Sequence, residues 1–270
     1  MDMVYIDGMV SIVMPSYNSE RFIAESIRSV IAQTCDNWEL IIVDDCSSDM
    51  TVEVAQSFAK ADSRIKVLVN EMNSGAAQSR NRALREARGE WIAFLDSDDL
   101  WDREKLRLQL GFMEKTGAAF SYTQYRTIDE DGLATGKVFF GPARISEKGM
   151  RRFCWPGCLT VMYRRPDVGL IQIADLKRHN DYAMWIKASK KADCVLLPET
   201  LASYRLRRSS ISHGIGLKTQ ISHLYGLWRV GEADGRVQAV LNTTRNVVFG
   251  VYKKMRYVHR ANSNHIKFER

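Results

Sequence analysis

The sequence predicts an α/β fold with a mostly parallel central sheet flanked by helices. Through residues 10–95, short apolar runs alternate with segments whose apolar residues recur at helical spacing, and this alternation is typical of βαβ units. The run 91–95 has no charged or amide side chain, as expected of a strand buried on both faces. Asp96, Asp98 and Asp99 follow it directly. These carboxylates therefore stand at the carboxyl end of a central strand, where open α/β sheets bind ligands.

Four strands and three helices account for the first half of the chain. The strands are expected at 10–14, 39–43, 65–69 and 91–95. The helices between them are expected from about Phe22, after Ser48 or Asp49, and after Gly75, because apolar or helix-forming residues follow each of these points. Strands joined in this way run parallel, so their carboxyl ends share one edge of the sheet.

The second half of the chain has a less regular pattern. We expect helices at 103–115, 181–192, 217–230 and 236–255, strands at 118–122, 158–163 and 195–197, and a glycine-punctuated loop at 132–141. Trp155, ahead of the strand at 158–163, has two interpretations: it forms part of a sugar-stacking wall, or it simply packs in the core.

Positive charge is concentrated near the end of the chain. The net charge is +7, and residues 204–270 contain 13 Lys or Arg but 3 Asp or Glu. Lys253, Lys254, Arg256 and Arg260 lie together in a segment that also has apolar residues at helical spacing. A basic amphipathic helix suits an anionic membrane surface. The alternatives are a solvated basic face without a partner and a homo-oligomer formed by pairing of these helices.

The sequence argues against several classes of protein. It contains neither a GxGxxG fingerprint nor a GxxxxGK[ST] loop, which disfavours dinucleotide oxidoreductases and P-loop enzymes. Five cysteines without paired spacing indicate reduced thiols in a cytoplasmic protein. We expect neither a secretory signal nor a membrane-spanning helix. No nucleic-acid partner is expected, because few aromatic residues accompany the basic ones.

A set of polar and aromatic residues lies near the expected strand ends. Its members are Pro15, Tyr17, Asp44, Asp45, Arg80, Asp96 and Asp98. An aromatic ring can stack on a nucleobase, a carboxylate can accept a hydrogen bond from a ring N–H, and crowded carboxylates favour Mg²⁺ or Mn²⁺. Together these groups suit a nucleoside diphosphate and a divalent metal.

At these positions the chain resembles the family 2 glycosyltransferases of the GT-A fold, of the bacterial polysaccharide and O-antigen type. The matching segments are Val13-Met14-Pro15-Ser16-Tyr17-Asn18, residues 41–49, Asn73-Ser74-Gly75 with Arg80-Asn81, and Leu95-Asp96-Ser97-Asp98-Asp99. The resemblance is close over 10–115 and weaker from there to about 210. It implies a GT-A domain at 1–213, with a nucleotide-binding half (1–115) and an acceptor-binding half (116–213), followed by a basic helical extension (214–270).

The resemblance also implies roles for the residues of the first half. Pro15, Tyr17 and Asp45 line the nucleobase pocket. Arg80 approaches the base or the phosphates, and Asp96 approaches the ribose. These are expectations for the nucleotide part of the donor.

The metal and the general base are assigned by the same resemblance. Asp98 binds the divalent metal, Mn²⁺ or Mg²⁺. The family usually places its base in a Glu-Asp pair ahead of a tryptophan, so Asp181 is the expected base although its neighbour here is Asn180. Arg207 stands where many relatives have a histidine; it cannot ligate a metal but can neutralise a departing pyrophosphate. His213 is an alternative for that role.

The expected activity is transfer of a sugar from a nucleotide-sugar, a UDP-sugar by resemblance, to a hydroxyl of a saccharide acceptor. A single base acting in line with the departing nucleotide predicts inversion at the anomeric carbon. A polyprenyl-diphosphate-linked acceptor in surface polysaccharide or lipopolysaccharide biosynthesis, reached from the inner face of the membrane, suits the basic tail. Two alternatives stay open: a nucleotidyltransferase, and a non-catalytic nucleotide-sugar-binding protein.

Overall fold

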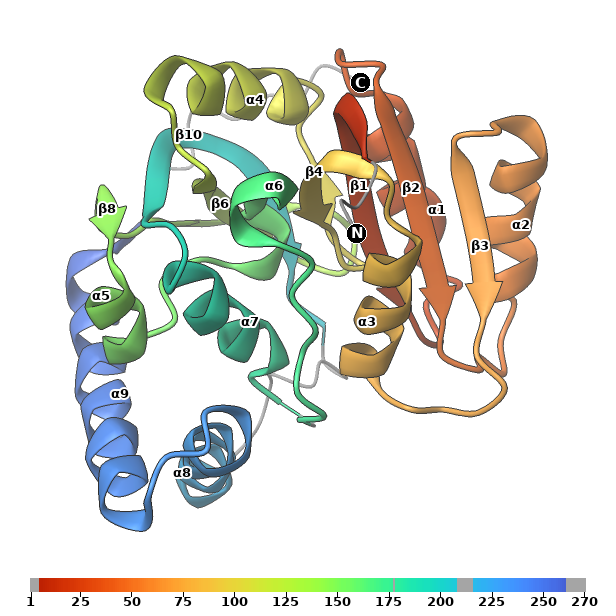
Figure 1. Ribbon diagram of the computed structural model, residues 1–270. Coiled ribbons are helices and arrows are strands. Elements are labelled where there is room, and N and C mark those ends of the chain that lie inside the picture. The colour runs from red at the N-terminus through yellow and green to blue at the C-terminus, as the bar shows by residue number, and fades with distance from the viewer. Residues whose placement is uncertain (1–4, 177, 208–215, 261–270) are drawn as a thin grey trace.

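A twisted central sheet with helices on both faces organises the chain (Figure 1). The computed structural model describes residues 5–176, 178–207 and 216–260. Within them, the sheet runs in the order β11-β7-β6-β9-β4-β1-β2-β3, and β10 joins it through β6. The predicted α/β class is confirmed.

The first half contains the parallel part of the sheet. Its strands are β1 (Ile6–Ser16), β2 (Trp38–Asp44), β3 (Ile65–Val69) and β4 (Gly89–Phe94), and its helices are α1 (Ile23–Ile31), α2 (Thr51–Ala61) and α3 (Ala76–Glu86). β1 pairs in parallel with both β2 and β4, and β2 pairs with β3. The strand order reverses beside β1, between β2 and β4, and such switch points are where open α/β sheets bind ligands.

Both faces of this parallel sheet are covered. On one face Val13 packs in a core that includes Leu84 of α3 and Trp185. On the other face Ile12 packs with Ile27 of α1. Because successive side chains of a strand point to opposite faces, a strand covered on both sides must be apolar throughout, as the runs in β1, β2 and β4 are.

The second half adds strands that are partly antiparallel and helices of varied length. They are β5 (Leu100–Trp101), α4 (Lys105–Thr116), β6 (Phe120–Ile128), β7 (Ala134–Phe139), β8 (Arg144–Ile145), α5 (Glu147–Arg152), a 3₁₀ turn (Cys158–Thr160), β9 (Met162–Arg164), α6 (Arg165–Val168), α7 (Asn180–Ser189) and β10 (Cys194–Arg205). β9 pairs antiparallel with both β4 and β6, and β10 runs parallel to β6. β9 therefore joins the two halves into one sheet.

Three sequence-based expectations in this half are wrong. The segment expected to be a loop at 132–141 contains β7, which pairs antiparallel with β6 despite its glycines. The strand expected at 158–163 begins as a 3₁₀ turn and is extended only at 162–164. The strand expected at 195–197 continues to Arg205, because a register irregularity between Leu197 and Thr200 accommodates Pro198, which has no N–H to donate.

The C-terminal helices pack against the second half of the chain. They are α8 (Leu217–Gly226), a π-helical turn η2 (Leu227–Gly231) and α9 (Arg236–Arg256), followed by β11 (Val258–Arg260). In Figure 1, α9 runs alongside α5. Among the residues that the structure describes, no helix is both long and apolar enough to cross a bilayer.

Lys253 and Trp155 lie in the interior of this region. Lys253 does not belong to an exposed basic face: it turns inward, and its Nζ donates to the carbonyl oxygen of Trp155 at 2.9 Å. Trp155 is a core residue, 5% exposed, with ring contacts to Phe153, Phe249 and Tyr257. Of its two interpretations, core packing describes the structure.

Candidate active site

A tight turn carries the acidic cluster at the carboxyl end of β4. The N–H of Asp99 donates to the carbonyl oxygen of Asp96 at 3.1 Å, which folds the turn. The hydroxyls of Ser97 and Ser19 are hydrogen-bonded at 2.8 Å. Ser19 follows β1, so this contact ties the acidic turn to the loop after the neighbouring strand, at the switch point of the sheet.

Arg80 connects the acidic turn to the first residue of α7. Its guanidinium forms an ion pair with Asp96, and another of its N–H groups donates to the side-chain oxygen of Asn180 at 2.8 Å. Burial alone would lower the pKa of Arg80, but the negative charges of Asp96 and Asp181 raise it above its ordinary value. A buried guanidinium with a raised pKa keeps its charge, so it links the two halves of the chain as a fixed cation.

Asp98 and Asp99 contact two arginines, Arg205 at the end of β10 and Arg207 just beyond it. Arg207 forms an ion pair with Asp98, with 3.2 Å between Nε and Oδ2. Burial, followed by the negative charge of Asp96, raises the pKa of Asp98. Burial and the charges of Asp98 and Asp96 raise the pKa of Asp99 further. Carboxylates held this close in a buried turn are electrostatically costly until a cation lies among them.

Arg205 was not singled out by the sequence analysis, yet it makes the densest set of contacts at this turn. Its backbone N–H donates to Asp99 Oδ1 at 2.8 Å, and its Nε donates to the carbonyl oxygen of Asp98 at 2.8 Å. Its guanidinium also reaches Glu25 of α1 at 2.5 Å and the carbonyl oxygen of Glu130 at 3.0 Å. The side chain is 1% exposed. Arg207, two residues further on, lies on the same side, since the guanidiniums of both arginines lie over the ring of Phe22.

Asp45 organises the turn ahead of α3. Its Oδ1 accepts hydrogen bonds from the N–H of Ser74 at 3.0 Å and from the side chain of Asn70 at 2.8 Å. Its Oδ2 accepts from the N–H of Gly75 at 2.7 Å. Burial by itself would raise the pKa of Asp45, but these hydrogen bonds hold it below its ordinary value. Gly75 has φ 86°, a conformation that favours glycine, so both the acid and the glycine are needed to form this turn.

The other predicted nucleotide-binding residues lie at the end of β1. Pro15 is buried opposite Val43 of β2. Tyr17 is 49% exposed in the loop that follows, so its ring is accessible to a ligand. The next residue, Asn18, accepts a hydrogen bond from the N–H of Ser48 at 2.9 Å, which fastens this loop to the loop after β2.

Asp181 lies in the first turn of α7, beside Asn180. Its Oδ1 accepts from the N–H of Tyr182 at 2.8 Å. Asn180 is buried, and its side-chain oxygen is occupied by Arg80. Asp96 is therefore the carboxylate that pairs with Arg80, and Asn180 contributes a neutral acceptor.

The structure thus brings most of the predicted residues to one edge of the sheet. Asp96, Asp98, Arg80, Arg207 and the Asn180–Asp181 pair are joined by direct contacts or by the charge of Arg80. In the part of the chain that is described, the hydrogen bonds of Asp45 go to Asn70, Ser74, Gly75 and Ser79 and not to the acidic turn. His213 lies outside the described residues.

Comparison with known proteins identifies the class. The model for glycosyl transferase family 2 matches residues 11–163. A β-1,3-glucosyltransferase of Escherichia coli, WfgD, is 41% identical over 208 residues, which is 76% of this chain and 80% of WfgD. Its full description is UDP-Glc:α-D-GlcNAc-diphosphoundecaprenol β-1,3-glucosyltransferase.

Two solved structures share the fold. TarS of Staphylococcus aureus (residues 1–349, in complex with UDP-GlcNAc) matches with a TM-score of 0.68 at 21% identity, over 92% of this chain and 76% of that chain. The mannosyltransferase PcManGT of Pyrobaculum calidifontis, in complex with GDP-Man and Mn²⁺, matches with a TM-score of 0.62 at 16% identity, over 90% and 75%.

The fold is that of the GT-A glycosyltransferases. The chain belongs to glycosyl transferase family 2, as the family match over more than half of its length and the relationship to WfgD show.

Proposed function

We propose that this glycosyltransferase is an inverting, metal-dependent enzyme that transfers a sugar from a UDP-sugar to a hydroxyl of a lipid-linked saccharide. WfgD, with which it shares 41% identity, is described as using UDP-Glc and a diphosphoundecaprenol-linked acceptor. An acceptor of that kind belongs to surface polysaccharide biosynthesis.

One observation carries the proposal: Arg80 contacts both Asp96 and Asn180. Asp96 belongs to the acidic turn that we assign to the ribose of the donor, and Asn180 adjoins Asp181, which we assign as the base. Linked through one buried cation, the donor side and the base side keep a fixed separation. Fixed positioning of a base relative to a leaving group is what an in-line displacement requires.

The acidic turn fits a divalent metal held together with substrate phosphates. Within the described parts of the chain, no three His, Cys, Asp or Glu side chains form a complete ligand set. Mg²⁺ and Mn²⁺ sites for nucleotides commonly use one or two carboxylates and complete their coordination with phosphate oxygens and water. Asp98 would hold the metal, and the buried Asp99 Oδ2, which accepts no hydrogen bond from the described residues, is a carboxylate oxygen that a bound cation could contact. A bound metal would supply charge neutralisation for the departing nucleotide.

Protein side chains complete the proposed chemistry. Asp181 removes the proton of the acceptor hydroxyl. Arg207, which already lies beside Asp98, neutralises the charge that develops on the departing nucleoside diphosphate. Charge compensation of this kind contributes roughly 2–4 kcal/mol per well-placed donor.

The nucleobase pocket is proposed at the ends of β1 and β2. The exposed Tyr17 ring stacks on the base, and Pro15 forms the floor beneath it. Asp45 Oδ2, which accepts one hydrogen bond from Gly75, accepts the ring N–H. The remaining contacts of Asp45 hold the loop in place and keep the carboxylate ionised, so that it acts as an acceptor.

The proposed division of labour follows the chain: residues 1–115 bind the nucleotide, 116–213 form the acceptor side, and the basic extension 214–270 meets the membrane. The enzyme would then work at the inner, anionic face of the cytoplasmic membrane, where a polyprenyl-diphosphate-linked acceptor is held. The excess of basic residues in 204–270 is the charge that supports this location.

A panel of sugar donors tests the proposal. Release of nucleoside diphosphate is measured for UDP- and GDP-sugars with and without Mn²⁺, in the presence of a diphosphate-linked GlcNAc acceptor. We expect metal-dependent release from a UDP-sugar, a β-linked product from an α-linked donor, and loss of release in Asp98→Ala. Equal release without metal, or unaltered release by Asp98→Ala, would contradict the proposed site. Asp193→Ala, a change of the same kind outside the acidic turn, is the control.

A further inference from the structure

Helix α9 buries two asparagines and a threonine and exposes most of its large apolar side chains. Its buried residues are Ala239, Asn242, Thr243 and Asn246. Its exposed large apolar residues are Val237, Val240, Leu241, Val248, Val251, Tyr252 and Met255. A surface helix of a globular protein usually turns its apolar residues to the core and its polar residues to water. The outer face of α9 is therefore suited to apolar surroundings.

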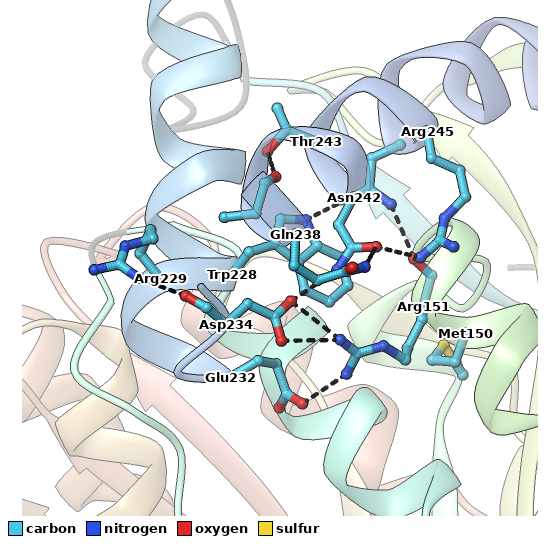
Figure 2. Close-up of polar contacts among 12 residues, drawn as sticks. Met150, Arg151, Trp228, Arg229, Glu232, Asp234, Gln238, Asn242, Thr243 and Arg245 are labelled. Atoms are coloured by element: carbon cyan, nitrogen blue, oxygen red, sulfur yellow. Dashed lines mark hydrogen bonds and ion pairs between the residues drawn. The ribbon is translucent and has the colours of Figure 1, made fainter. Parts of the chain in front are cut away.

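The inner face is held in a single orientation by hydrogen bonds. Asn246 accepts from Trp228 Nε1 at 3.1 Å and donates to the carbonyl oxygen of Arg152 at 2.7 Å. Asn242 donates to Asp234 Oδ2 at 2.7 Å, and Arg151 forms an ion pair with the same carboxylate at 3.1 Å (Figure 2). Buried polar groups with partners in fixed directions specify one way of packing. Because the inner face cannot rotate away from this network, the apolar face must point outward.

The outward apolar residues form one stripe, in which the exposed Thr244 is the polar member. At about 100° per residue, Val237, Leu241, Val248 and Met255 fall within about 40° of a common direction, opposite Asn242 and Asn246. Val237 is 76% exposed and Met255 82% exposed. The stripe extends along the helix from its first turn to its last, over about 27 Å at 1.5 Å per residue.

Cations flank the stripe on both sides. At the same 100° per residue, Arg236 and Lys254 lie on one flank and Arg256 on the other, and all three are exposed. The sequence of α9 contains no Asp or Glu. Exposed cations beside an apolar stripe let the long side chains reach the phosphates while the apolar residues enter the acyl boundary.

A basic hollow lies against the same helix. It has a volume of about 360 Å³, and its lining includes Arg144, Lys148 and Arg152 together with Phe249 and Tyr252 of α9. Lys148 and Arg152 are exposed, and Tyr252 also belongs to the apolar stripe. The hollow therefore adds positive charge beside the stripe, where lipid phosphates would lie.

We infer that the outer face of α9 is a docking surface for an anionic lipid bilayer, on which the helix lies parallel to the membrane plane. This inference rests on the proposed function for its biological setting and refines it by assigning the contact to one face of one helix. Charge decides against a second copy of the chain as occupant. Two such helices packed through their stripes would bring Arg236, Lys254 and Arg256 of both copies together without an opposing acid.

Vesicle binding tests the docking surface. The full chain is mixed with vesicles of phosphatidylcholine alone, or of two parts phosphatidylcholine to one part phosphatidylglycerol, and the bound fraction is measured by co-sedimentation. We expect binding to the anionic vesicles that weakens when salt is raised from about 0.1 M to about 1 M, where the Debye length falls from about 10 to about 3 Å. Leu241→Glu and Val248→Glu should each reduce binding at least about tenfold, because each places a charge in the acyl boundary.

Matched variants separate apolar insertion, charge and folding. Leu133→Glu, in the β6–β7 turn, changes an equally exposed leucine outside α9 and should leave binding unchanged. The double variant Lys254→Gln, Arg256→Gln should lose several-fold affinity for anionic vesicles, whereas Lys115→Gln at the end of α4 should not. Because the altered side chains are exposed, all variants should melt at the temperature of the unmodified protein.

Three results would overturn the inference: no binding of the unmodified chain to anionic vesicles, unchanged binding of Leu241→Glu, or a dimer in solution that Leu241→Glu dissociates. Nucleotide release with a short, water-soluble diphosphate-linked acceptor is measured in parallel. Vesicle binding by a chain that fails on every donor would leave the docking surface in place and remove the proposed function. Activity on the soluble acceptor without vesicle binding would leave the proposed function in place and remove the docking surface.

Discussion

Arg80 is buried between two halves of the site, paired with Asp96 while it donates to Asn180. It is the residue through which the acidic turn after β4 and the start of α7 contact each other. Because Arg presents N–H groups on separate nitrogens of a rigid fork, it reaches both partners at once, whereas the N–H groups of Lys all lie on one nitrogen.

Arg80→Lys should lower kcat/KM by at least about tenfold while keeping the charge, since one of the two contacts must be lost. Arg80→Met should abolish most activity and destabilise the fold by roughly 2–4 kcal/mol, because a buried ion pair loses one partner. This destabilisation is at or below the value for a fully buried pair, because Asp96 is partly exposed. Urea unfolding and steady-state kinetics measure the two effects. Arg85→Met, a more exposed arginine on the same helix, should change neither appreciably, and an active Arg80→Met enzyme would refute the assigned link.

Arg205→Met should destabilise the fold by roughly 2–4 kcal/mol, since it removes a buried guanidinium from two loop carbonyls and from Glu25, which is itself half exposed. Asp99 keeps its backbone contact with residue 205, so the effect on activity comes through the position of the turn. At a temperature where the variant is folded, we expect a lower affinity for Mn²⁺ together with a reduced kcat. If the variant bound Mn²⁺ as tightly as the unmodified protein, Arg205 would stabilise the fold without positioning the acidic turn for the metal.

Asp181→Asn should reduce kcat by about 10²–10⁴-fold, the usual contribution of a general base, and leave the KM for the nucleotide-sugar close to its original value. The amide can still accept from the Tyr182 N–H, so the helix start should persist. Asp175→Asn, an exposed change in the preceding loop, is the matched control. Turnover within a few-fold of the unmodified enzyme would transfer the role of base to another group.

Lys253 should make stability depend on pH in a defined window. Burial lowers its pKa from 10.5 to about 8, against the opposing negative charges around it. Between about pH 8 and 10.5 the unfolded chain holds this proton and the folded chain does not, so stability should rise with pH there. Below about pH 8 the full cost of the buried charge is present.

Two variants isolate the contribution of Lys253 to the pH dependence of stability. The free energy of unfolding of the unmodified protein minus that of Lys253→Met should increase from pH 8 to pH 10. The same difference for Lys254→Met, the exposed neighbour, should stay flat across this range. A flat difference for Lys253→Met as well would mean that its amine titrates normally.

Much of the fold could be predicted because burial on both faces of the sheet imposes a local pattern. The apolar runs of β1, β2 and β4 and the helical spacing of α1 and α2 are visible in the chain without knowledge of its partners. β7 was mistaken for a loop because its glycines mark turns locally, whereas its pairing with β6 is decided elsewhere in the chain. β10 was underestimated because Pro198 ends a strand in most contexts, and here a register irregularity accommodates it.

The candidate site also contains residues that the sequence pattern marks and residues that only the folded structure reveals. Carboxylates placed directly after apolar strands marked Asp45, Asp96 and Asp98, because the carboxyl ends of parallel strands meet at one edge. Arg205 was overlooked because its importance comes from Glu25, Asp98 and Asp99, which are distant in sequence. The inward turn of Lys253 was likewise hidden, since the helical pattern gives a periodicity and not the face that is buried.

The sequence by itself determined the α/β class, the family and the residues at the edge of the sheet, because these depend on short-range patterns and on motifs within a few residues. Only the tertiary structure decided that Arg80 joins the two halves, that Arg205 braces the acidic turn, and that α9 turns its asparagines inward and its valines outward. Those arrangements depend on which side chains meet across the fold. A buried hydrogen bond or ion pair gains its strength from a partner that only the folded chain brings within reach.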